Sequence, residues 1–303
     1  MVPALDKLTE EFTSLVVTEN PAHANFLAAA LGAASRETLD QLEAYINYCQ
    51  SSGLTIAYLV DCYNTITLDT QIEQIFFRKH KRYRWSRFSE VADHVYFNEE
   101  YMRKYMYGLA LTAFLWPNHT AMHQFFERTF PRQATGNYLE IGPGHGYYFM
   151  EATKLGNFEK LTAIDISAAS VALTTDIVRH FGLNKKRDME ILETDFLNYH
   201  TDKTFSCIVM GEVLEHVEQP DLFLRKIADL STSETHVFVT TCINAPAVDH
   251  LYLFRDVAEV DTIIRDSGLD IIDSFACPYA GKTLQESIEL TLPVNVAYVL
   301  KAA

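Results

Sequence analysis

The second half of the chain alternates short apolar runs with helical segments, and this alternation limits the fold more than any other feature. From Gly136 onward, runs rich in Val, Ile and Leu are separated by stretches with the apolar spacing of helices. The pattern predicts an α/β fold, in which helices cover both faces of a parallel sheet. The predicted strands are 138–141, 161–166, 189–192, 205–210, 237–242, 271–276 and 296–300, and the predicted helices are 147–155, 167–181, 221–230 and 255–267.

The first 130 residues have a different texture. They hold only three glycines, and their apolar residues follow helical spacing over long stretches. Ser35 and Asn98 each stand where a helix cap is expected, directly before such a stretch. This part is therefore predicted to be mostly helical, with a division from the rest of the chain near residue 110.

The charge of the chain excludes some partners. With 25 Lys and Arg against 40 Asp and Glu, the net charge is −15, so bulk affinity for nucleic acid or an anionic membrane is not expected. One stretch, Arg78–Arg87, departs from this background with six Lys and Arg and no acid. We interpret it first as pairing with the chain's own acids. An acidic substrate or carrier protein and RNA are the alternatives.

Five cysteines lie far apart and lack the spacing of a metal site, so no metal is expected. We expect free structural thiols in a reducing compartment. The N-terminus lacks the pattern of a signal peptide, and no apolar run is long enough for a membrane helix. A cytoplasmic protein is the expectation.

A glycine-rich loop follows the first predicted strand, with the pattern E-x-G-x-G-x-G over residues 140–146. Its glycines let the backbone turn tightly and approach a ligand. Asp165 ends the second strand, where a carboxylate is placed to accept hydrogen bonds from both ribose hydroxyls of an adenosine. An ordinary strand–helix turn is the alternative. A dinucleotide site would require a third glycine where Tyr147 stands.

Two further segments narrow the choice of ligand. Asp195 follows the third strand, where it suits an adenine amino group, and the sequence E-V-L-E-H-V follows the fourth strand at 212–217. Together with the glycine loop and Asp165, these segments resemble class I S-adenosylmethionine-dependent methyltransferases. The resemblance is specific over 137–242 and looser towards the C-terminus.

The resemblance implies a Rossmann-like seven-stranded sheet whose last strand is antiparallel. It implies a helical cap and substrate domain at 1–110, a catalytic domain at 111–303, and S-adenosylmethionine as cofactor. The glycines would surround the methionine moiety and ribose, and Glu140 beneath them would hold either the loop or the amino group. The adenine would lie between Ile166 and the Asp195 region, and Glu212 would lie near the methionyl end. The implied cofactor-binding residues are Glu140, Gly142, Gly144, Gly146, Asp165, Ile166, Asp195, Phe196 and Glu212.

Methyl transfer from a sulfonium is an in-line displacement, so alignment supplies much of the rate and a base is needed only for a protonated acceptor. The candidate catalytic residues are His216, His250 and Tyr252, with packing as the alternative for each. His145 is expected to shape the glycine loop. The segment 116–119 is expected either to pack between helices or to close over the cofactor.

The expected reaction is O-methylation of a small organic acceptor. The setting that the resemblance of the layout implies is microbial secondary metabolism. N- or C-methylation of a small molecule or a carrier-bound substrate is the alternative. Two other classes stay open, namely a non-catalytic S-adenosylmethionine-binding interaction protein and a nicotinamide-dependent dehydrogenase, which Tyr147 disfavours. A homodimer through the helical domain is a further expectation.

Overall fold

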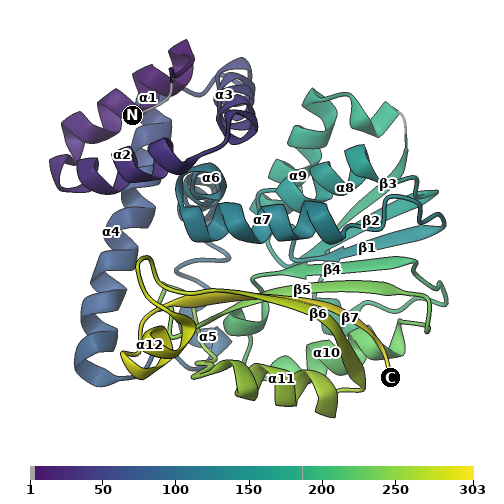
Figure 1. Cartoon of the computed structure of the whole chain (residues 1–303). Helices are drawn as coiled ribbons and strands as arrows, with labels where there is room; N and C mark the ends of the chain where they lie inside the picture. The colour runs from purple at the N-terminus through teal and green to yellow at the C-terminus, as the bar shows by residue number, and fades with distance from the viewer. Residues whose placement is uncertain (1–3, 186) are drawn as a thin grey trace.

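The computed structural model describes residues 4–185 and 187–303. Its centre is a seven-stranded sheet in the order β3-β2-β1-β4-β5-β7-β6 (Figure 1). Strands β1 to β5 run parallel, and β7 is antiparallel to both of its neighbours. This confirms the expected fold class. The strands are β1 Asn137–Ile141, β2 Lys160–Asp165, β3 Asp188–Glu193, β4 Cys207–Gly211, β5 His236–Ile243, β6 Leu269–Cys277 and β7 Val294–Ala302.

Helices account for nearly all regular structure before β1. Two predicted caps are present, since Ser35 Oγ accepts a hydrogen bond from the Thr38 amide at 3.0 Å and Asn98 Oδ1 accepts one from the Tyr101 amide at 3.1 Å. The helices are α1 Lys7–Glu19, α2 Ala24–Ala33, α3 Arg36–Ser51, α4 Ile56–His80, α5 Phe88–Val91, α6 Glu99–Leu115, α7 Pro117–Thr129, α8 Tyr147–Leu155, α9 Ala168–His180, α10 Pro220–Asp229, α11 Val257–Asp266 and α12 Leu284–Glu289.

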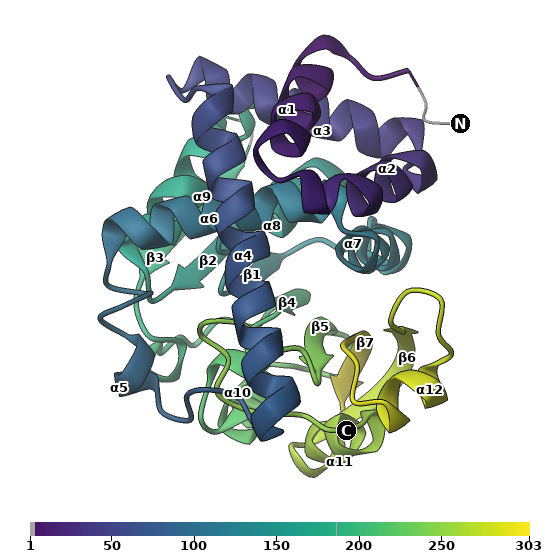
Figure 2. The ribbon, with the colours of Figure 1, turned by 90° about the vertical axis from the view of Figure 1, so that its left-hand side faces the viewer.

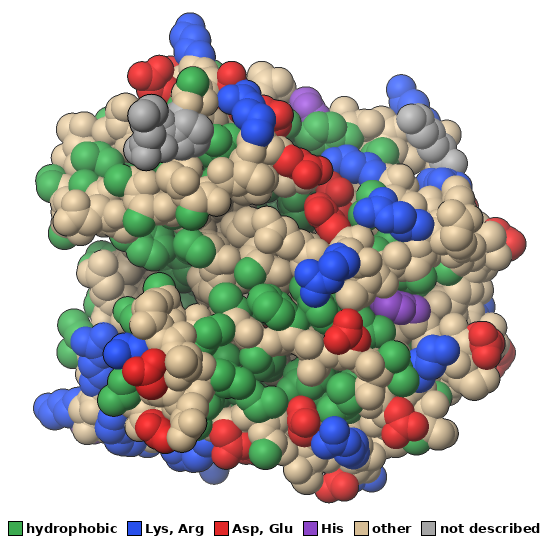
Figure 3. Space-filling model, in the orientation of Figure 1, with side chains coloured by type: hydrophobic (Ala, Val, Ile, Leu, Met, Phe, Trp, Pro, Cys, Tyr) green, Lys and Arg blue, Asp and Glu red, His purple; other side chains and the backbone are tan. Residues whose placement is uncertain are grey.

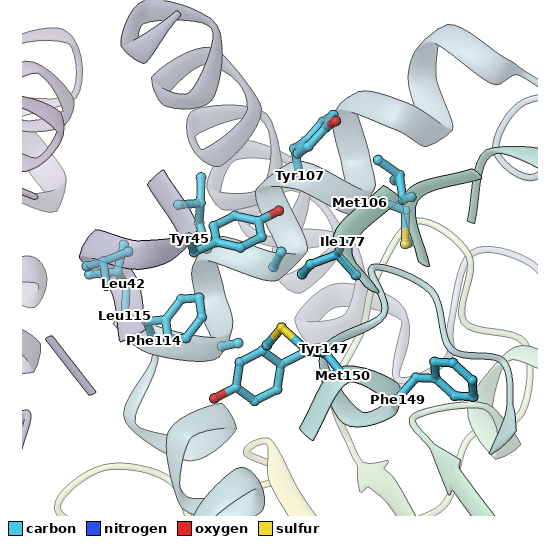
Figure 4. Packing of buried hydrophobic residues seen from close by; sticks show 14 of the residues in the cluster. Leu42, Tyr45, Met106, Tyr107, Phe114, Leu115, Tyr147, Phe149, Met150 and Ile177 are labelled. Atoms are coloured by element: carbon cyan, nitrogen blue, oxygen red, sulfur yellow. The ribbon is translucent and has the colours of Figure 1, made fainter. Parts of the chain in front are cut away.

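Two apolar cores cover the two faces of the sheet. Strand residues alternate between them, so Tyr138 faces one core while Leu139 and Ile141 face the other. The first core also contains the N-terminal helices, for example Tyr45 beside Phe114 on α6 (Figure 4). Helices α10 and α11 cover the opposite face (Figure 1). The N-terminal helices therefore share one continuous core with the sheet.

The division expected near residue 110 stays a prediction, and that residue lies inside α6. Helices α6 and α7 lie close to the sheet, while α4 runs along one side of the molecule (Figures 1 and 2). No helix among the described residues has the length and apolar character needed to cross a membrane.

Some predicted strand ends differ from the observed ones. β6 and β7 are longer than predicted because their pairing continues past the apolar runs, with Asp270 opposite Lys301. Conversely, Phe205 belongs to no strand although it is buried, and β4 begins at Cys207. Hydrophobicity locates the buried centre of a strand, whereas backbone pairing decides where the strand ends.

Candidate functional site

A cavity of about 1000 Å³ lies at the carboxyl ends of the parallel strands. Ile141 of β1, Gly211 of β4 and Cys242 of β5 line it from the sheet, and α4, α6 and α7 line it from the other side. Figure 3 shows a hollow with apolar side chains between the N-terminal helices and the β6–β7 side of the molecule. Small-molecule sites usually span about 300–1000 Å³, so this cavity has room for two ligands of moderate size.

The glycine loop has the backbone geometry that its sequence predicts. Gly142, Gly144 and Gly146 have φ values of +66°, +55° and +81°, a region that favours glycine. Only the first two line the cavity. A Cβ on Gly146 would lie 2.9 Å from the Cα of Thr174, so this glycine allows α9 to pack closely against the loop.

Asp165 lies on the cavity wall and also fixes the loop. Its Oδ2 accepts a hydrogen bond from the Gly144 amide at 3.1 Å, and its Oδ1 accepts one from the Ser167 amide at 2.9 Å. Burial raises the pKa of this carboxyl to about 6. The loop and the start of α9 are therefore joined by one side chain.

Glu140 is placed differently from the other cofactor candidates. It is buried beneath the loop, is not part of the cavity wall, and accepts a hydrogen bond from the Tyr138 hydroxyl. Burial raises the pKa of Glu140 to about 8. Of the two roles expected for it, its position favours holding the loop.

Three more of the cofactor candidates, Ile166, Asp195 and Phe196, also line the cavity. Asp195 also caps a short turn, because its Oδ1 accepts a hydrogen bond from the Leu197 amide at 2.9 Å. Sequence reasoning missed Ser170 on α9. This residue lines the cavity, and its fully buried hydroxyl has no hydrogen-bond partner among the described residues.

Glu212 follows β4 with an unusual φ of +52° and lines the cavity. Asn295 donates a hydrogen bond to its Oε2 at 3.3 Å, while its buried Oε1 has no partner in the described part of the chain. Asn118 of α7 holds Asn295 in turn, at 2.8 Å. Burial raises the pKa of Glu212 well above its usual range. A ligand with a hydrogen-bond donor would satisfy this oxygen.

His216 and Asp249 form a pair on the opposite part of the wall. The Nδ1 of His216 lies 3.2 Å from Oδ2 of Asp249. Burial alone would lower the pKa of His216, but the charge and hydrogen bond of Asp249 outweigh it and raise that pKa to about 9. Burial would likewise raise the pKa of Asp249, but His216 outweighs it and lowers that pKa to about 2. The pair is therefore an imidazolium and a carboxylate at neutral pH.

Two tyrosines that sequence reasoning missed complete this pair. The hydroxyls of Tyr96 and Tyr105 donate hydrogen bonds to the two oxygens of Asp249, at 3.1 and 3.3 Å. Because the Tyr96 proton goes to Asp249, its oxygen accepts a hydrogen bond from Nδ1 of His216 at 3.0 Å. All hydrogen bonds of His216 in the described residues use Nδ1, which leaves Nε2 free.

The other two catalytic candidates occupy different places. His250 lines the cavity with its ring edge against His216, at 4.7 Å between centroids, and its Nδ1 donates to the Ala245 carbonyl at 2.6 Å. Burial lowers its pKa, so this ring is neutral. Tyr252, by contrast, is not on the cavity wall. Its ring packs on Phe254, and its hydroxyl donates to Glu259 at 3.4 Å, so the structure does not bring it to the site.

Two other predicted features also reach the wall. His145 accepts a hydrogen bond from the Tyr147 amide at 3.3 Å, as expected for a residue that shapes the loop, and burial lowers its pKa to about 4. The segment from Trp116 to His119, at the junction of α6 and α7, lines the cavity as well.

The cavity wall carries an uneven set of charged side chains. None of the described residues that line it is a lysine or an arginine. The positive charge on the wall comes from the imidazolium of His216. Six carboxyl side chains line it, namely Asp165, Asp195, Glu212, Glu215, Glu218 and Asp249.

Two groups of wall residues are close enough together to hold a metal ion, and both include His250. In the first group, Thr241 donates a hydrogen bond to Glu215 at 2.7 Å, and Nδ1 of His250 is engaged with Ala245. In the second, His216 pairs with Asp249. Hydrogen bonding within the protein accounts for both groups. The expectation of no metal stays a prediction.

The basic stretch lies at the end of α4 and in the loop that follows. Arg84 pairs with the buried Glu73 at 2.8 Å, and the guanidinium groups of Arg82 and Arg84 lie over Phe76. Tyr83 is buried, while the remaining cations are exposed. Internal pairing therefore accounts for part of this stretch. The five cysteines are free thiols, as predicted, with Cys277 only half-buried.

Residues 117–264 match the family model described as a methyltransferase domain. The match shows a methyltransferase domain over these residues, which make up just under half of the chain. The strand order, the antiparallel β7 and the glycine loop at the end of β1 agree with this result. S-adenosylmethionine is the cofactor of this domain.

Comparisons with individual proteins are less extensive. A segment of 101 residues is 35% identical to EEF1A lysine methyltransferase 2 of Danio rerio, covering 32% of this chain and 42% of that relative. Similar solved structures include the N-methyltransferase NodS from Bradyrhizobium japonicum WM9 in complex with S-adenosyl-L-homocysteine. It is 18% identical, with 60% of this chain and 87% of that chain covered and a TM-score of 0.46. The [4+2]-cyclase SpnF is 14% identical, with 60% and 80% covered and a TM-score of 0.49.

Proposed function

We propose that the chain transfers the methyl group of S-adenosylmethionine to a hydroxyl oxygen of a small organic acceptor. One observation carries this proposal. A single cavity joins the glycine loop and Asp165 to the pair formed by His216 and Asp249. The first half suits an adenosine-bearing cofactor, and the second offers a ring nitrogen that can accept a proton.

The cofactor half fits S-adenosylmethionine on two structural grounds. The unpartnered Oε1 of Glu212 would accept a hydrogen bond from the ammonium group of the methionyl moiety, and the unpartnered hydroxyl of Ser170 offers a polar contact on the same wall. Asp165 would bind the ribose hydroxyls, and the region of Asp195 would hold the adenine. When bound, the cofactor supplies an activated methyl group on a positively charged sulfur.

His216 would act as the general base. Asp249 and Tyr96 hold the proton on Nδ1, so in the neutral ring Nε2 carries the lone pair. As the acceptor oxygen takes the methyl group, the electron pair of the broken bond stays on sulfur and the hydroxyl proton passes to Nε2. With a pKa of about 9, roughly 1% of His216 is neutral at pH 7. The reaction should therefore accelerate as the pH rises.

The wall charges restrict the acceptor. An anionic acceptor, such as a carboxylate or a phosphate ester, would meet no lysine or arginine among the described wall residues. It would instead meet six carboxyl side chains, of which Asp249 is ionised while burial raises the pKa of Glu212 well above its usual range. The one cation, His216, is already paired with Asp249. We therefore assign an uncharged or positively charged acceptor to this site. An acidic substrate or carrier is disfavoured.

A second candidate is N-methylation of an amine. The same carboxyl groups would attract an ammonium acceptor, and the sequence match to a lysine methyltransferase points in that direction. An amine would need to lose a proton before attack, so His216 would serve both reactions.

An acceptor screen tests the proposal. Purified protein and S-adenosylmethionine are incubated with matched compounds that differ in one group, such as tyramine, tyrosol and 4-hydroxyphenylacetate, and release of S-adenosylhomocysteine is measured. Mass spectrometry and NMR then identify the methylated atom. Turnover restricted to anionic acceptors would contradict the charge argument. Tight cofactor binding without turnover of any acceptor would favour a non-catalytic binding protein, and binding of NAD alone would favour a dehydrogenase.

A further inference from the structure

Helix α4 exposes large aliphatic side chains on the side away from the cavity. Leu68, Ile72 and Ile75 are 57%, 45% and 68% exposed. Their spacing of four and three residues places them on one face of the helix. Thr67 and Thr70 of the same helix line the cavity. α4 therefore has an inner face that helps to build the site and an outer face with exposed aliphatic side chains.

The outer face carries opposite charges at its two ends. Helical periodicity places Asp61 and Lys79, both exposed, in line with the three aliphatic residues. We call this row the α4 stripe, and it comprises Asp61, Thr65, Leu68, Ile72, Ile75 and Lys79. In Figure 2 α4 crosses the front of the molecule along most of its height, with its outer side towards the viewer.

The order of residues in the stripe is symmetric about position 70. If a second α4 is laid antiparallel across it with a two-fold axis at that position, Asp61 faces Lys79 of the second copy, and Leu68 faces Ile72 of the second copy. Thr65 faces Ile75 in the same way. Every pair occurs twice, as two-fold symmetry requires. We propose that two copies of this chain associate through antiparallel contact of their α4 stripes.

The charges favour a second copy over other occupants. A parallel arrangement would place Lys79 against Lys79, and an anionic membrane would repel the end that carries Asp61. Asp61 already contacts Lys104 through Oδ2 at 2.6 Å, yet its side chain is 59% exposed. A carboxylate accepts several hydrogen bonds, so Asp61 can also pair with a lysine of the second copy.

The mass of the full-length protein in solution is the first test. Light scattering and sedimentation from low to high micromolar concentration should show a species of twice the 34.5 kDa of one chain. Ile72→Glu should shift it to the monomer, because it places a buried charge beside Leu68 of the second copy. Ile272→Glu is the matched control, since Ile272 is also exposed, at 57%, but lies on the edge strand β6. It should leave the dimer intact.

A charge exchange tests the antiparallel register. Asp61→Lys and Lys79→Glu should each weaken the dimer by about tenfold, because each creates two like-charge pairs. An equal mixture of the two variants should restore association, since both contacts between the different chains then join opposite charges. Unchanged binding of S-adenosylhomocysteine would show that the variants are folded.

Three outcomes would overturn the inference. A wild-type chain that stays monomeric at high concentration would exclude the dimer. A dimer that survives Ile72→Glu would place the interface elsewhere. A mixture that fails to restore association would exclude this antiparallel register.

Discussion

The two halves of the cavity are built in different ways. The cofactor half consists of residues that directly follow neighbouring strands, such as Gly142 after β1 and Asp165 at the end of β2. The acceptor half is assembled from distant parts of the chain. Tyr96, which meets Asp249 and His216, is 153 and 120 residues away from them in sequence.

This difference explains why one half has a sequence signature and the other lacks one. The glycine loop requires a left-handed backbone at Gly142 and Gly144. Glycine is the residue that adopts this conformation most readily, so the requirement can be recognised in the sequence. Contact between Tyr96 and Asp249 requires only that two elements pack side by side, and many sequences achieve that. Substitutions in the two halves should therefore separate cofactor affinity from turnover.

The largest effect on cofactor affinity is expected in the glycine loop. Gly144 has φ of +55°, and a Cβ there would lie 3.3 Å from Met106 Sδ on α6. Gly144→Val should weaken S-adenosylhomocysteine binding at least about a hundredfold, roughly 2.7 kcal/mol, because valine resists this conformation and crowds the wall. Isothermal calorimetry measures the affinity, and circular dichroism checks the fold.

Gly182→Val is the matched control for that change. Gly182 has a similar φ of +66°, but a Cβ there would meet nothing within 4 Å. Gly182→Val should lower the stability of the protein through backbone strain, and its affinity for S-adenosylhomocysteine should equal that of the wild type. Equal affinity in the two variants would mean that the glycine loop is only a structural turn.

The acceptor half should respond in turnover instead. His216→Gln should lower kcat by about 10²–10⁴, the usual contribution of a general base, with cofactor affinity nearly unchanged. In the wild type, kcat/KM should rise with pH up to the His216 pKa of about 9 and then level off, because the reactive form is the deprotonated ring. A flat pH profile would remove His216 from the chemistry.

Asp249→Asn sharpens this test. Without the carboxylate, the pKa of His216 should fall, because burial is then opposed mainly by the charge of Glu215. The rising part of the profile should then move to lower pH, while the maximal rate falls because the imidazolium formed in the reaction loses its partner. A merely structural role would reduce the rate without moving the profile.

A smaller loss is expected at the end of β2. Asp165→Ala should weaken cofactor binding by about 1.5–3 kcal/mol, or roughly ten- to hundredfold, the scale of hydrogen bonds to a charged group. The structure adds a second cause, since the same carboxylate holds the Gly144 amide. Asp165→Asn keeps one acceptor oxygen and should lose less. Unchanged affinity in the alanine variant would place the ribose elsewhere.

The sequence predicted the sheet and most of the cofactor half because both depend on local rules. Alternating elements determined the fold, and backbone conformation marked the loop. The roles of Tyr96, Tyr105 and Ser170 were not predicted. Tyr105 and Ser170 look like ordinary helical residues, and Tyr96 lies in the turn between α5 and α6 with no motif beside it. Tyr252 illustrates the converse case. Its position in the chain suggested a place at the acceptor, whereas its hydroxyl lies beside Glu259 and its side chain is not on the cavity wall.

The smallest predicted effect concerns Ser170. This residue is an exception to the comparison, because it lies in the cofactor half of the cavity but belongs to no sequence motif. Its buried hydroxyl has no partner among the described residues, so a bound cofactor would supply one. Ser170→Ala should weaken S-adenosylhomocysteine binding by about 0.5–1.5 kcal/mol, roughly two- to tenfold, and leave the stability of the free protein unchanged or higher. Ser231→Ala is a suitable control, since that hydroxyl already donates to the Ile227 carbonyl at 2.7 Å and the residue is not part of the cavity wall. It should cost stability but not affinity. If both variants bind the cofactor as the wild type does, the Ser170 hydroxyl has no role in binding, and only the residues that follow the strands hold the cofactor.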